Sequence, residues 1–298
     1  MVITTGFFDG VHLGHRYLLS QLVAEAKARG DHSMVVTFWP HPRTVLQQDA
    51  RELRLLTSLQ EKKDLILGQG VDFVEVLPFS KQFAELTAVE YLSMLHERFG
   101  ADVVLMGYDN RIGSDRLTAD SVISTDRSEQ RNLPPIEIKP LAALSSDDLP
   151  SISSTKIRKA LESGDIALAN SMLGYEYRLH GVVVAGNQMG RRIGFPTANM
   201  KLYEPLKLIP LNGVYCVRVH LPYGDSRLGM CNIGVRPTIG GGGLTIETNI
   251  FGFNDDIYGL DLKIDFLERI RPERKFGSFE ELRQQLQEDK TLCLKIGF

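Results

Sequence analysis

The first half of this chain begins with the segment Val2-Ile3-Thr4-Thr5-Gly6-Phe7-Phe8-Asp9-Gly10-Val11-His12-Leu13-Gly14-His15, from which its fold can be predicted. It begins as a short apolar strand, passes through a turn with two glycines, and enters a helix whose apolar residues recur three and four positions apart from Leu18 to Ala26. A second strand-like run, Met34–Phe38, comes next. Strand, helix and strand in this order form the unit of a parallel sheet, so the sequence predicts an α/β domain.

The same alternation continues through the first half of the chain. Ser58 and Glu61 have the spacing of a capping box at a helix start, and a further helix is predicted from Ser153 to Leu173. The other predicted elements are two buried strands and the helix between them: Asp72–Leu77, Thr87–Phe99 and Ala101–Met106. We therefore expect a doubly wound α/β fold in this half.

After Gly174 the pattern changes to short β-rich segments separated by Gly, Pro and Asn. These segments are Arg178–Ala185, Gly213–Leu221, Met230–Ile233, Leu244–Phe251 and Leu260–Leu267. Consecutive short strands predict a small antiparallel barrel. One helix follows, with Ser278 and Glu281 at capping-box spacing. The change of pattern predicts two domains, 1–172 and 173–298, which fits a chain of 298 residues.

The composition excludes several classes of protein. The chain has 34 Lys and Arg against 37 Asp and Glu, so its net charge of −3 gives no broad positive field for a nucleic acid. Cys216, Cys231 and Cys293 form no CxxC pair, which is typical of a reducing cytoplasm. No apolar run approaches the ~18 residues of a membrane span, and no export signal precedes the first strand. We expect a cytoplasmic protein without nucleic-acid or membrane partners.

The turn after the first predicted strand has the features of a phosphate site. Gly6 and Gly10 let the backbone approach a ligand, and the helix start offers free N–H groups. His12 and His15 lie three residues apart, so both imidazoles can face one anion. Fixed donors of this kind stabilise a leaving pyrophosphate, as nucleotidyl transfer requires. An HxxH pair also occurs as a plain helix start or in a zinc site, for which His41 is the available third ligand.

A second polar helix start, Ser153-Ser154-Thr155-Lys156-Ile157-Arg158, lies near the end of this half. Hydroxyls at such a position are ordinarily caps. Arg158 comes three residues after Thr155, so one helical turn can also offer hydroxyls, N–H groups and a guanidinium to a triphosphate. The cap and the phosphate site are compatible with each other.

The barrel half has its own candidate site. The segment from Gly186 to Asn199 is glycine-rich but lacks the Gly-Lys-Ser/Thr of a Walker A loop, so it is either another kind of phosphate loop or a plain hairpin. Thr197 and Asn199 supply neutral oxygens that suit Mg²⁺. Glu247 lies on a predicted strand, either facing solvent or, if its face lines the barrel mouth, serving as a general base for a primary alcohol.

Four motifs in order resemble those of the prokaryotic bifunctional riboflavin kinase/FMN adenylyltransferases, or FAD synthetases. They are Gly6–His15, Thr37-Phe38-Trp39-Pro40-His41-Pro42, Gly107-Tyr108-Asp109 and Ile152–Arg158. The resemblance implies that residues 1–172 form a Rossmann-like nucleotidyltransferase domain. It implies catalytic roles at the ATP phosphates for His12, His15 and Arg158, and a nucleotide site lined by Gly6, Phe7, Asp9, Asp109, Ser154 and Thr155. The chain departs from the family at Asn110 and Ile112, where relatives often carry aromatic residues.

The second half resembles the riboflavin kinase module of the same family, a six-stranded antiparallel barrel with a C-terminal helix. The matching motifs are Gly190–Asn199, Asn232–Thr238, Glu247-Thr248-Asn249, Tyr258-Gly259 and Arg271-Pro272-Glu273. The resemblance implies that Thr197 and Asn199 bind Mg²⁺, that Glu247 is the catalytic base, and that Arg271 contacts the flavin. It also implies that Gly190 and Gly194 belong to the nucleotide site, and Asn249 stands where many relatives have His.

The resemblance implies two ATP-dependent reactions: riboflavin to FMN in the second half, and FMN to FAD with release of pyrophosphate in the first. The expected small-molecule partners are riboflavin, FMN, FAD and ATP, with Mg²⁺ as cofactor, and the expected state is a monomer or weak homo-oligomer. One alternative is a monofunctional riboflavin kinase with a weakened first half, and another is a nucleotidyltransferase for a different phosphorylated acceptor. A non-catalytic flavin- or RNA-binding module is a third, but the chain lacks a KMSKS-like stretch and a basic patch.

Overall fold

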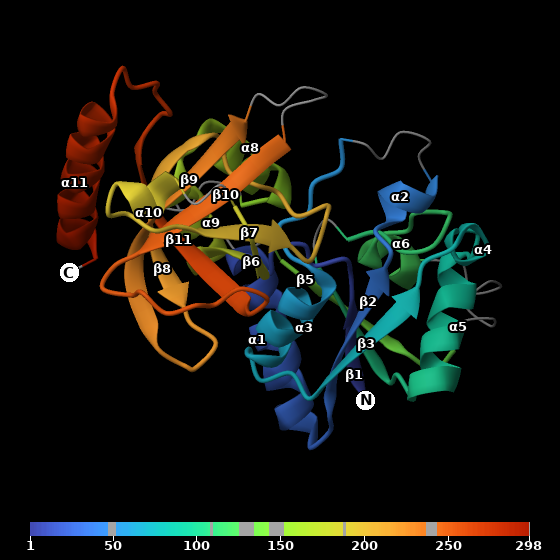
Figure 1. Cartoon of the computed structure of the whole chain (residues 1–298). Helices are drawn as coiled ribbons and strands as arrows, with labels where there is room; N and C mark the ends of the chain where they lie inside the picture. The colour runs from blue at the N-terminus through green and yellow to red at the C-terminus, as the bar shows by residue number, and fades with distance from the viewer. Residues whose placement is uncertain are drawn as a thin grey trace. The chain divides into compact units, whose positions relative to one another are not determined.

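The computed structural model describes residues 1–46, 52–107, 110–124, 134–142, 152–186, 189–236 and 243–297. These residues divide into two compact units, Met1–Ser154 and Thr155–Phe298 (Figure 1). Each unit has its own clusters of buried apolar side chains, so each is described by itself.

A parallel sheet lies at the centre of the first unit. Within the described ranges its strand order is β3-β2-β1-β4-β5, and every neighbouring pair is parallel. The strands are β1 (Val2–Thr5), β2 (Ser33–Trp39), β3 (Phe73–Pro78), β4 (Val103–Gly107) and β5 (Glu137–Leu141). The chain winds outward from β1 in both directions, which confirms the predicted doubly wound fold and brings the carboxyl ends of the central strands to one edge.

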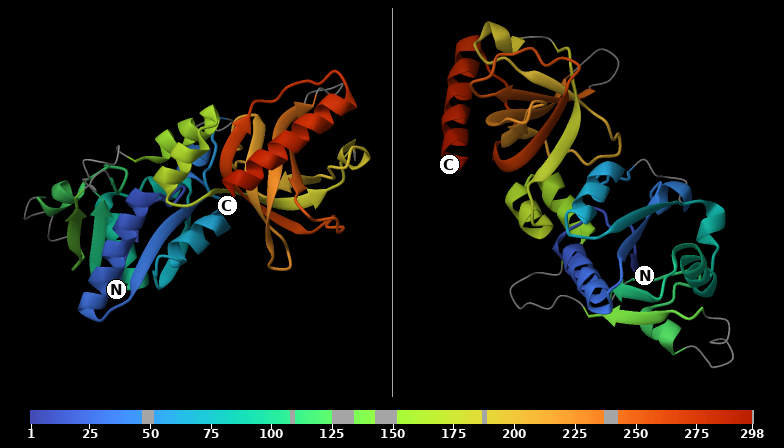
Figure 2. Two further views of the ribbon diagram at one scale, coloured as in Figure 1. Left: turned by 90° about the vertical axis from the view of Figure 1, so that its left-hand side faces the viewer. Right: turned by 90° about the horizontal axis from the view of Figure 1, so that it is seen from below.

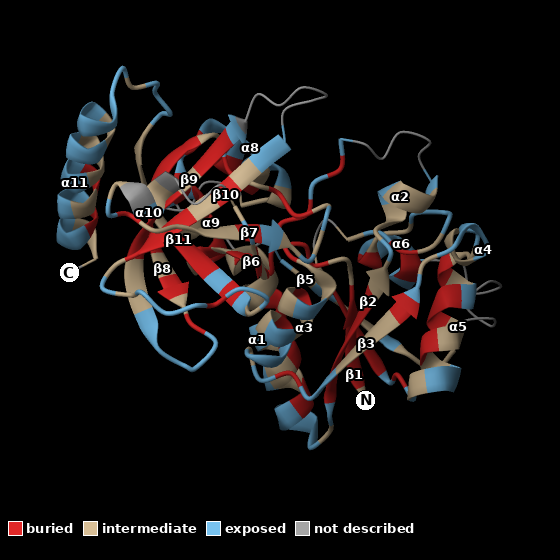
Figure 3. Ribbon diagram, viewed as in Figure 1, coloured by how far each residue is buried: buried red, intermediate tan, exposed pale blue. Residues whose placement is uncertain are grey.

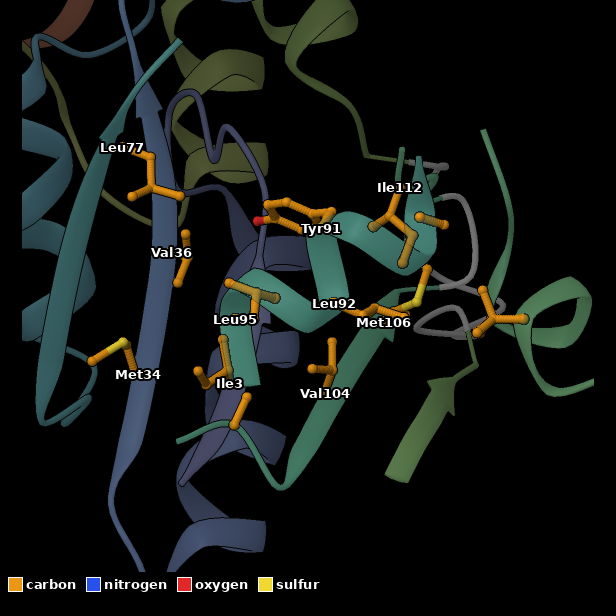
Figure 4. Packing of buried hydrophobic residues seen from close by; sticks show 14 residues of the cluster. Ile3, Met34, Val36, Leu77, Tyr91, Leu92, Leu95, Val104, Met106 and Ile112 are labelled. Atoms are coloured by element: carbon orange, nitrogen blue, oxygen red, sulfur yellow. The ribbon is translucent and has the colours of Figure 1, made fainter. Parts of the chain in front are cut away.

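Helices cover both faces of this sheet because neighbouring strand residues point to opposite sides. Val103 packs in the cluster under α1 (Leu13–Arg29) and α3 (Leu59–Leu67), whereas Val104 packs in the cluster under α5 (Ala88–Phe99) and α6 (Ala119–Ile123). Figure 4 shows Leu95 of α5 beside Ile3 of β1 in the second cluster. The helices of this unit are α1 (Leu13–Arg29), α2 (Pro42–Leu46), α3 (Leu59–Leu67), α4 (Lys81–Ala84), α5 (Ala88–Phe99) and α6 (Ala119–Ile123).

The two predicted capping boxes form to different extents. The Ser58 hydroxyl accepts from the Glu61 N–H at 3.2 Å, and the Glu61 carboxylate accepts from the Ser58 N–H at 2.7 Å, so this box is complete. Ser278 also accepts from the Glu281 N–H, at 3.2 Å. The Glu281 carboxylate, however, accepts from the N–H of Gly277 at 2.8 Å instead of closing the box.

The single helix predicted from Ser153 to Leu173 is wrong. The structure has two helices there, α8 (Ser154–Ser163) and α9 (Ile166–Leu173). Gly164 between them has a φ of +80°, which ends α8, and the Asp165 side chain starts α9 by accepting from the Leu168 N–H at 3.0 Å. The apolar spacing continues across this break, which is why the sequence pattern hides it.

The described strands of the second unit close into a barrel in the order β10-β7-β6-β11-β8-β9, with antiparallel pairing throughout. They are β6 (Tyr177–Val184), β7 (Ala198–Leu202), β8 (Gly213–His220), β9 (Ser226–Arg236), β10 (Gly243–Ile250) and β11 (Asp261–Arg271), and a short helix, α10 (Met189–Arg192), precedes β7. Asn170 joins α9 to the barrel, donating to the Phe266 carbonyl at 2.9 Å and accepting from the Tyr177 N–H at 2.8 Å. No helix of the described residues is long and apolar enough to cross a membrane.

Helix α11 (Phe279–Ile296) lies along the outside of the barrel, with its exposed residues facing outward (Figures 2 and 3). An ion pair fixes it there: the Arg271 Nε and Nη2 atoms at the end of β11 lie 2.9 and 2.7 Å from the Asp289 carboxylate. The Asp289 side chain is only 1% exposed, and Gln285 donates to it at 2.9 Å. Removing one partner of such a pair leaves a buried charge without compensation.

We predict that Asp289→Ala lowers the free energy of unfolding of the barrel unit by about 3 kcal/mol, because it removes the buried carboxylate that pairs with the largely buried Arg271 guanidinium. Chemical denaturation followed by a barrel-specific probe, such as exchange of the β8 and β11 amides, measures this loss. Glu288→Ala, at the exposed neighbouring position, is the matched control and should change stability by less than about 0.5 kcal/mol. Equal effects of the two variants would contradict the assignment.

Candidate active sites

The turn between β1 and α1 has a strained backbone. Phe8 and Val11 have positive φ angles of 54° and 37°, and Gly10 has 80°. Only glycine adopts such angles easily, and a β-branched residue such as Val11 least of all. Strain of this kind persists only where the surroundings hold it, and it gathers at ligand sites. The contacts of this turn therefore define the first candidate site.

Asp9 anchors the turn. Its buried carboxylate accepts from the N–H groups of Leu56 and Thr57 at 3.0 and 3.1 Å, and the Thr57 hydroxyl accepts from the Gly10 N–H at 3.2 Å. On the other side, the Ser154 hydroxyl donates to the Asp9 carbonyl at 2.9 Å. Asp9 and Ser154 thus hold the predicted nucleotide loop in place, and their direct contact with a nucleotide stays a prediction.

The two histidines lie together at the start of α1. Their rings stack at 3.7 Å and 13°, and Nδ1 of His12 caps the helix by accepting from the His15 N–H at 3.3 Å. Burial lowers the pKa of His12 to about 4, and Asp9 opposes this shift only in part. Burial, with help from His12 and Lys62, holds the pKa of His15 well below its usual range. Both imidazoles are neutral at pH 7, and since Nδ1 of His12 accepts, its proton lies on Nε2, a hydrogen-bond donor.

His41 does not make the pair a zinc site. Its ring packs edge-on against Phe7, with the centroids 4.1 Å apart, and its Nδ1 accepts from the Arg43 N–H at 3.0 Å. Over the residues that the structure describes, no group of three or more His, Cys, Asp and Glu side chains could hold a metal ion.

A cavity of about 530 Å³ opens at the same edge of the sheet, and sequence reasoning did not predict it. Asn110 and Ile112, the two positions that depart from the family pattern, both line it. The Asn110 amide donates to the Thr5 carbonyl at 2.8 Å, at the carboxyl end of β1. The cavity wall is otherwise rich in aromatic and apolar side chains, including Phe7, Phe38, Phe79, Phe83, Leu86 and Tyr91. It suits a flat, largely apolar ring system.

The remaining residues predicted for this site are Asp109, Thr155 and Arg158. Asp109 lies outside the described residues. Thr155 and Arg158 lie on α8 within the second compact unit, where Thr155 is exposed and Arg158 half-buried. Their contact with ATP stays a prediction, whereas the structure brings Gly6, Phe7, Asp9, His12, His15 and Ser154 together around one turn.

The second candidate site lies where β7 and β10 pair at the barrel wall. Glu247 is in register with Asn199, and the Thr197 hydroxyl lies 3.5 Å from the Glu247 carboxylate. A side chain at Gly186 would overlap the Asn199 carboxamide, so glycine there makes room for it. A hydroxyl, an amide oxygen and a carboxylate are oxygen donors of the kind that Mg²⁺ binds, so these residues fit that ion.

Glycines also determine the conformation of the loop before β7. Any Cβ on Gly190 would overlap the Phe195 carbonyl, and Gly194 has a φ of +83°. Asn249, for which the sequence suggested no role, holds the loop by donating to the Pro196 carbonyl at 2.6 Å. A cavity of about 590 Å³ lies beside the loop, lined among others by Arg191, Gly194, Thr197, Asp255, Asp256 and Tyr258.

The Arg271 guanidinium contacts other residues of the protein itself. Besides the pair with Asp289, its Nη1 donates to the Pro272 carbonyl at 3.1 Å, and its guanidinium lies 5.8 Å from the Phe276 ring centre. These contacts place it between β11 and α11, and the flavin contact implied by the resemblance stays a prediction.

Known proteins match both halves of the chain. The family model of FAD synthetase matches residues 1–155 and that of riboflavin kinase matches residues 173–296. The bifunctional riboflavin kinase/FMN adenylyltransferase of Bacillus subtilis is 35% identical over 99% of this chain and 92% of its own length, and that of Escherichia coli K12 is 36% identical over 97% and 90%. A crystal structure described as a macrolide-efflux protein from Streptococcus pneumoniae superposes with a TM-score of 0.88 at 32% identity, covering 98% of this chain and 93% of that one.

The match therefore extends over both compact units and nearly the full length of the relatives, with the residue clusters described above inside the matched segments. The chain belongs to the family of bifunctional riboflavin kinase/FMN adenylyltransferases.

Proposed function

We propose that this protein makes FAD from riboflavin in two steps. The barrel unit transfers the γ-phosphoryl group of ATP to riboflavin to give FMN, and the first unit transfers AMP from a second ATP to FMN, releasing pyrophosphate. The observation that carries the proposal is the presence of two chemically different sites in separate compact units: a stacked pair of neutral imidazoles in one and a carboxylate beside a hydroxyl in the other.

In the kinase step the nucleophile is the primary alcohol of the ribityl chain, which attacks poorly until its proton is removed. The Glu247 carboxylate takes that proton while the alcohol oxygen bonds to the γ-phosphorus and the bond to ADP breaks. Thr197 and Asn199 would hold Mg²⁺ together with the ATP phosphates. When bound, the ion neutralises negative charge on those phosphates.

In the adenylyl step the nucleophile is a phosphate oxygen of FMN, which needs no base. It attacks the α-phosphorus of ATP, and negative charge moves to the departing pyrophosphate. The neutral imidazoles of His12 and His15, fixed by stacking, donate N–H groups to these phosphates and do not need to reorient during the reaction. No covalent enzyme intermediate is required.

The aromatic cavity supports FMN as the acceptor. Its wall of Phe38, Phe79, Phe83 and Tyr91 suits the isoalloxazine ring, and it shares Gly6 and Phe7 with the turn that carries the histidines. Asn110 and Ile112 line this cavity although relatives often carry aromatic residues at these positions, and the other aromatic residues of its wall are present.

We propose that the enzyme is located in the cytoplasm. Its functional domains are residues 1–172 and 173–298, and it forms a monomer or a weak homo-oligomer. Cys216, Cys231 and Cys293 are buried free thiols, as expected of a reducing compartment. The net charge of −3 supports small-molecule partners over nucleic acid.

We predict that Glu247→Gln lowers the rate of FMN formation about 10² to 10⁴-fold, because the amide cannot accept the proton of the alcohol. Incubation with riboflavin, ATP and Mg²⁺, followed by chromatographic separation of the flavins, measures this rate. Conversion of added FMN to FAD should be unchanged, and Glu268→Gln, an exposed carboxylate on β11, should leave both rates alone. Wild-type protein that leaves riboflavin unreacted would contradict the kinase assignment.

The opposite result is predicted for His15→Ala. Loss of one fixed donor should lower FMN-to-FAD conversion about 10² to 10³-fold while riboflavin phosphorylation continues. Pyrophosphate release with FMN, compared with release with other phosphate monoesters, measures the first activity and its acceptor. His32→Ala, at an exposed position of the same unit, is the control. Equal release with all monoesters would favour a nucleotidyltransferase for another acceptor.

The buried histidines also predict acid sensitivity of the first unit. With a folded pKa of about 4 against about 6.5 unfolded, His12 binds more protons in the unfolded state between these values, so stability falls as the pH drops through this window. The loss from pH 7 to pH 5 should be about 2 kcal/mol for His12 alone. Hydrogen exchange of the α1 amides in the whole protein measures it. His12→Asn keeps a capping acceptor without titrating, and an unchanged pH dependence in this variant would contradict the assignment.

A further inference from the structure

Lys62 on α3 is a buried cation that the reactions described so far do not use. The residue is only 1% exposed, although lysine is almost never fully buried unless it is paired. Its Nζ donates to the Phe7 carbonyl at 2.9 Å and lies 3.8 Å from the centre of the Phe7 ring. The lysine thus contacts both the backbone and the side chain of the first residue after Gly6 in the strained turn.

The charged and titratable groups around Nζ belong to the same site. Burial lowers the pKa of Lys62 to about 8, and the Asp9 carboxylate opposes this shift only in part. His15 lies on α1; burial is the main cause of its low pKa, and the nearby Lys62 ammonium lowers it further. His41 lies against the edge of the same Phe7 ring. An ammonium at this place is therefore coupled to the anchor of the turn and to one of the phosphate-binding imidazoles.

The turn is held at three points by one short segment of chain. Leu56 and Thr57 bind the Asp9 carboxylate, Thr57 binds the Gly10 N–H, and Lys62 binds the Phe7 carbonyl. The bonds to Asp9 and Gly10 hold the middle of the turn. Lys62 holds its beginning, where the Thr37 hydroxyl also donates to the Phe7 carbonyl at 3.2 Å. The strained Phe8 lies between these points, so the ammonium opposes its relaxation.

We propose that Lys62 is a positioning residue for adenylyl transfer: its ammonium binds the Phe7 carbonyl and keeps the turn in the strained conformation that presents His12 and His15 to ATP. This inference rests on the proposed adenylyl transfer by the first unit. Charge-assisted hydrogen bonds are roughly twice as strong as neutral ones, which is why the protonated form matters.

The test uses the full-length protein and Lys62→Met, which keeps an unbranched apolar stem and removes the ammonium. Steady-state conversion of FMN to FAD should show a KM for ATP raised about tenfold and a kcat/KM lowered about 10 to 100-fold, since small displacements of positioned groups cost this much. Riboflavin phosphorylation by the same preparation should be unchanged. Lys63→Met, the adjacent half-buried lysine on α3, is the matched control and should behave as wild type.

The pH dependence of kcat/KM distinguishes a positioning role of Lys62 from a purely structural role. In the wild type, kcat/KM for ATP in FAD formation should fall above pH 8 as the ammonium loses its proton, and this limb should be absent from Lys62→Met. A Lys62→Met protein with wild-type KM and kcat overturns the inference. If that variant unfolds in the first unit, a wild-type profile that stays flat from pH 7 to 9 overturns it. Wild-type protein that makes no FAD refutes the adenylyl transfer itself.

Discussion

The buried carboxylate of Asp9 accepts hydrogen bonds from the amides of Leu56 and Thr57, and this contact holds the turn of the first candidate site. Without it the turn after β1 would relax, because two of its non-glycine residues, Phe8 and Val11, sit at φ angles that cost on the order of 1–3 kcal/mol each. Hydrogen bonds to a charged group contribute about 1.5–3 kcal/mol each. Two such bonds donated to the Asp9 carboxylate, together with the bond that Lys62 donates to the Phe7 carbonyl, are enough to offset that strain.

The two sites differ because their nucleophiles differ. An alcohol must lose a proton to attack phosphorus, and we propose that Glu247, whose carboxylate lies 3.5 Å from the Thr197 hydroxyl, accepts this proton. The phosphate of FMN is already an anion and needs no base. The donors that we propose for it, His12 and His15, are neutral because burial lowers the pKa of both imidazoles. Enzymes catalyse phosphoryl transfer mainly by positioning the reactants and by stabilising charge.

Much of this arrangement follows from the sequence, because strand–turn–helix order, glycine spacing and capping pairs are local properties. They predicted the parallel sheet, the barrel and the placing of His12 and His15 at a helix start. The break at Gly164 was missed because the apolar period continues across it. Strand β7 was missed because it begins inside a glycine-rich loop. Lys62 was missed because a helical pattern assigns a lysine to the solvent face, and only the tertiary fold shows that its ammonium is buried. The aromatic cavity joins distant segments, which one sequence cannot reveal.

The glycines around the barrel site also limit how this enzyme can evolve. At Gly190 even a methyl group would collide with the Phe195 carbonyl, and at Gly186 it would collide with the Asn199 carboxamide. Most substitutions at these glycines would disrupt the loop, so they are not expected to be tolerated, whatever the selection on nucleotide or flavin preference. The cavity wall contributed by Phe253, Asn254, Asp255 and Asp256 consists of side chains outside any strand or helix, where exchanges disturb little else. Divergence in substrate choice among descendants of this protein should therefore accumulate in that loop, while the glycine framework stays fixed.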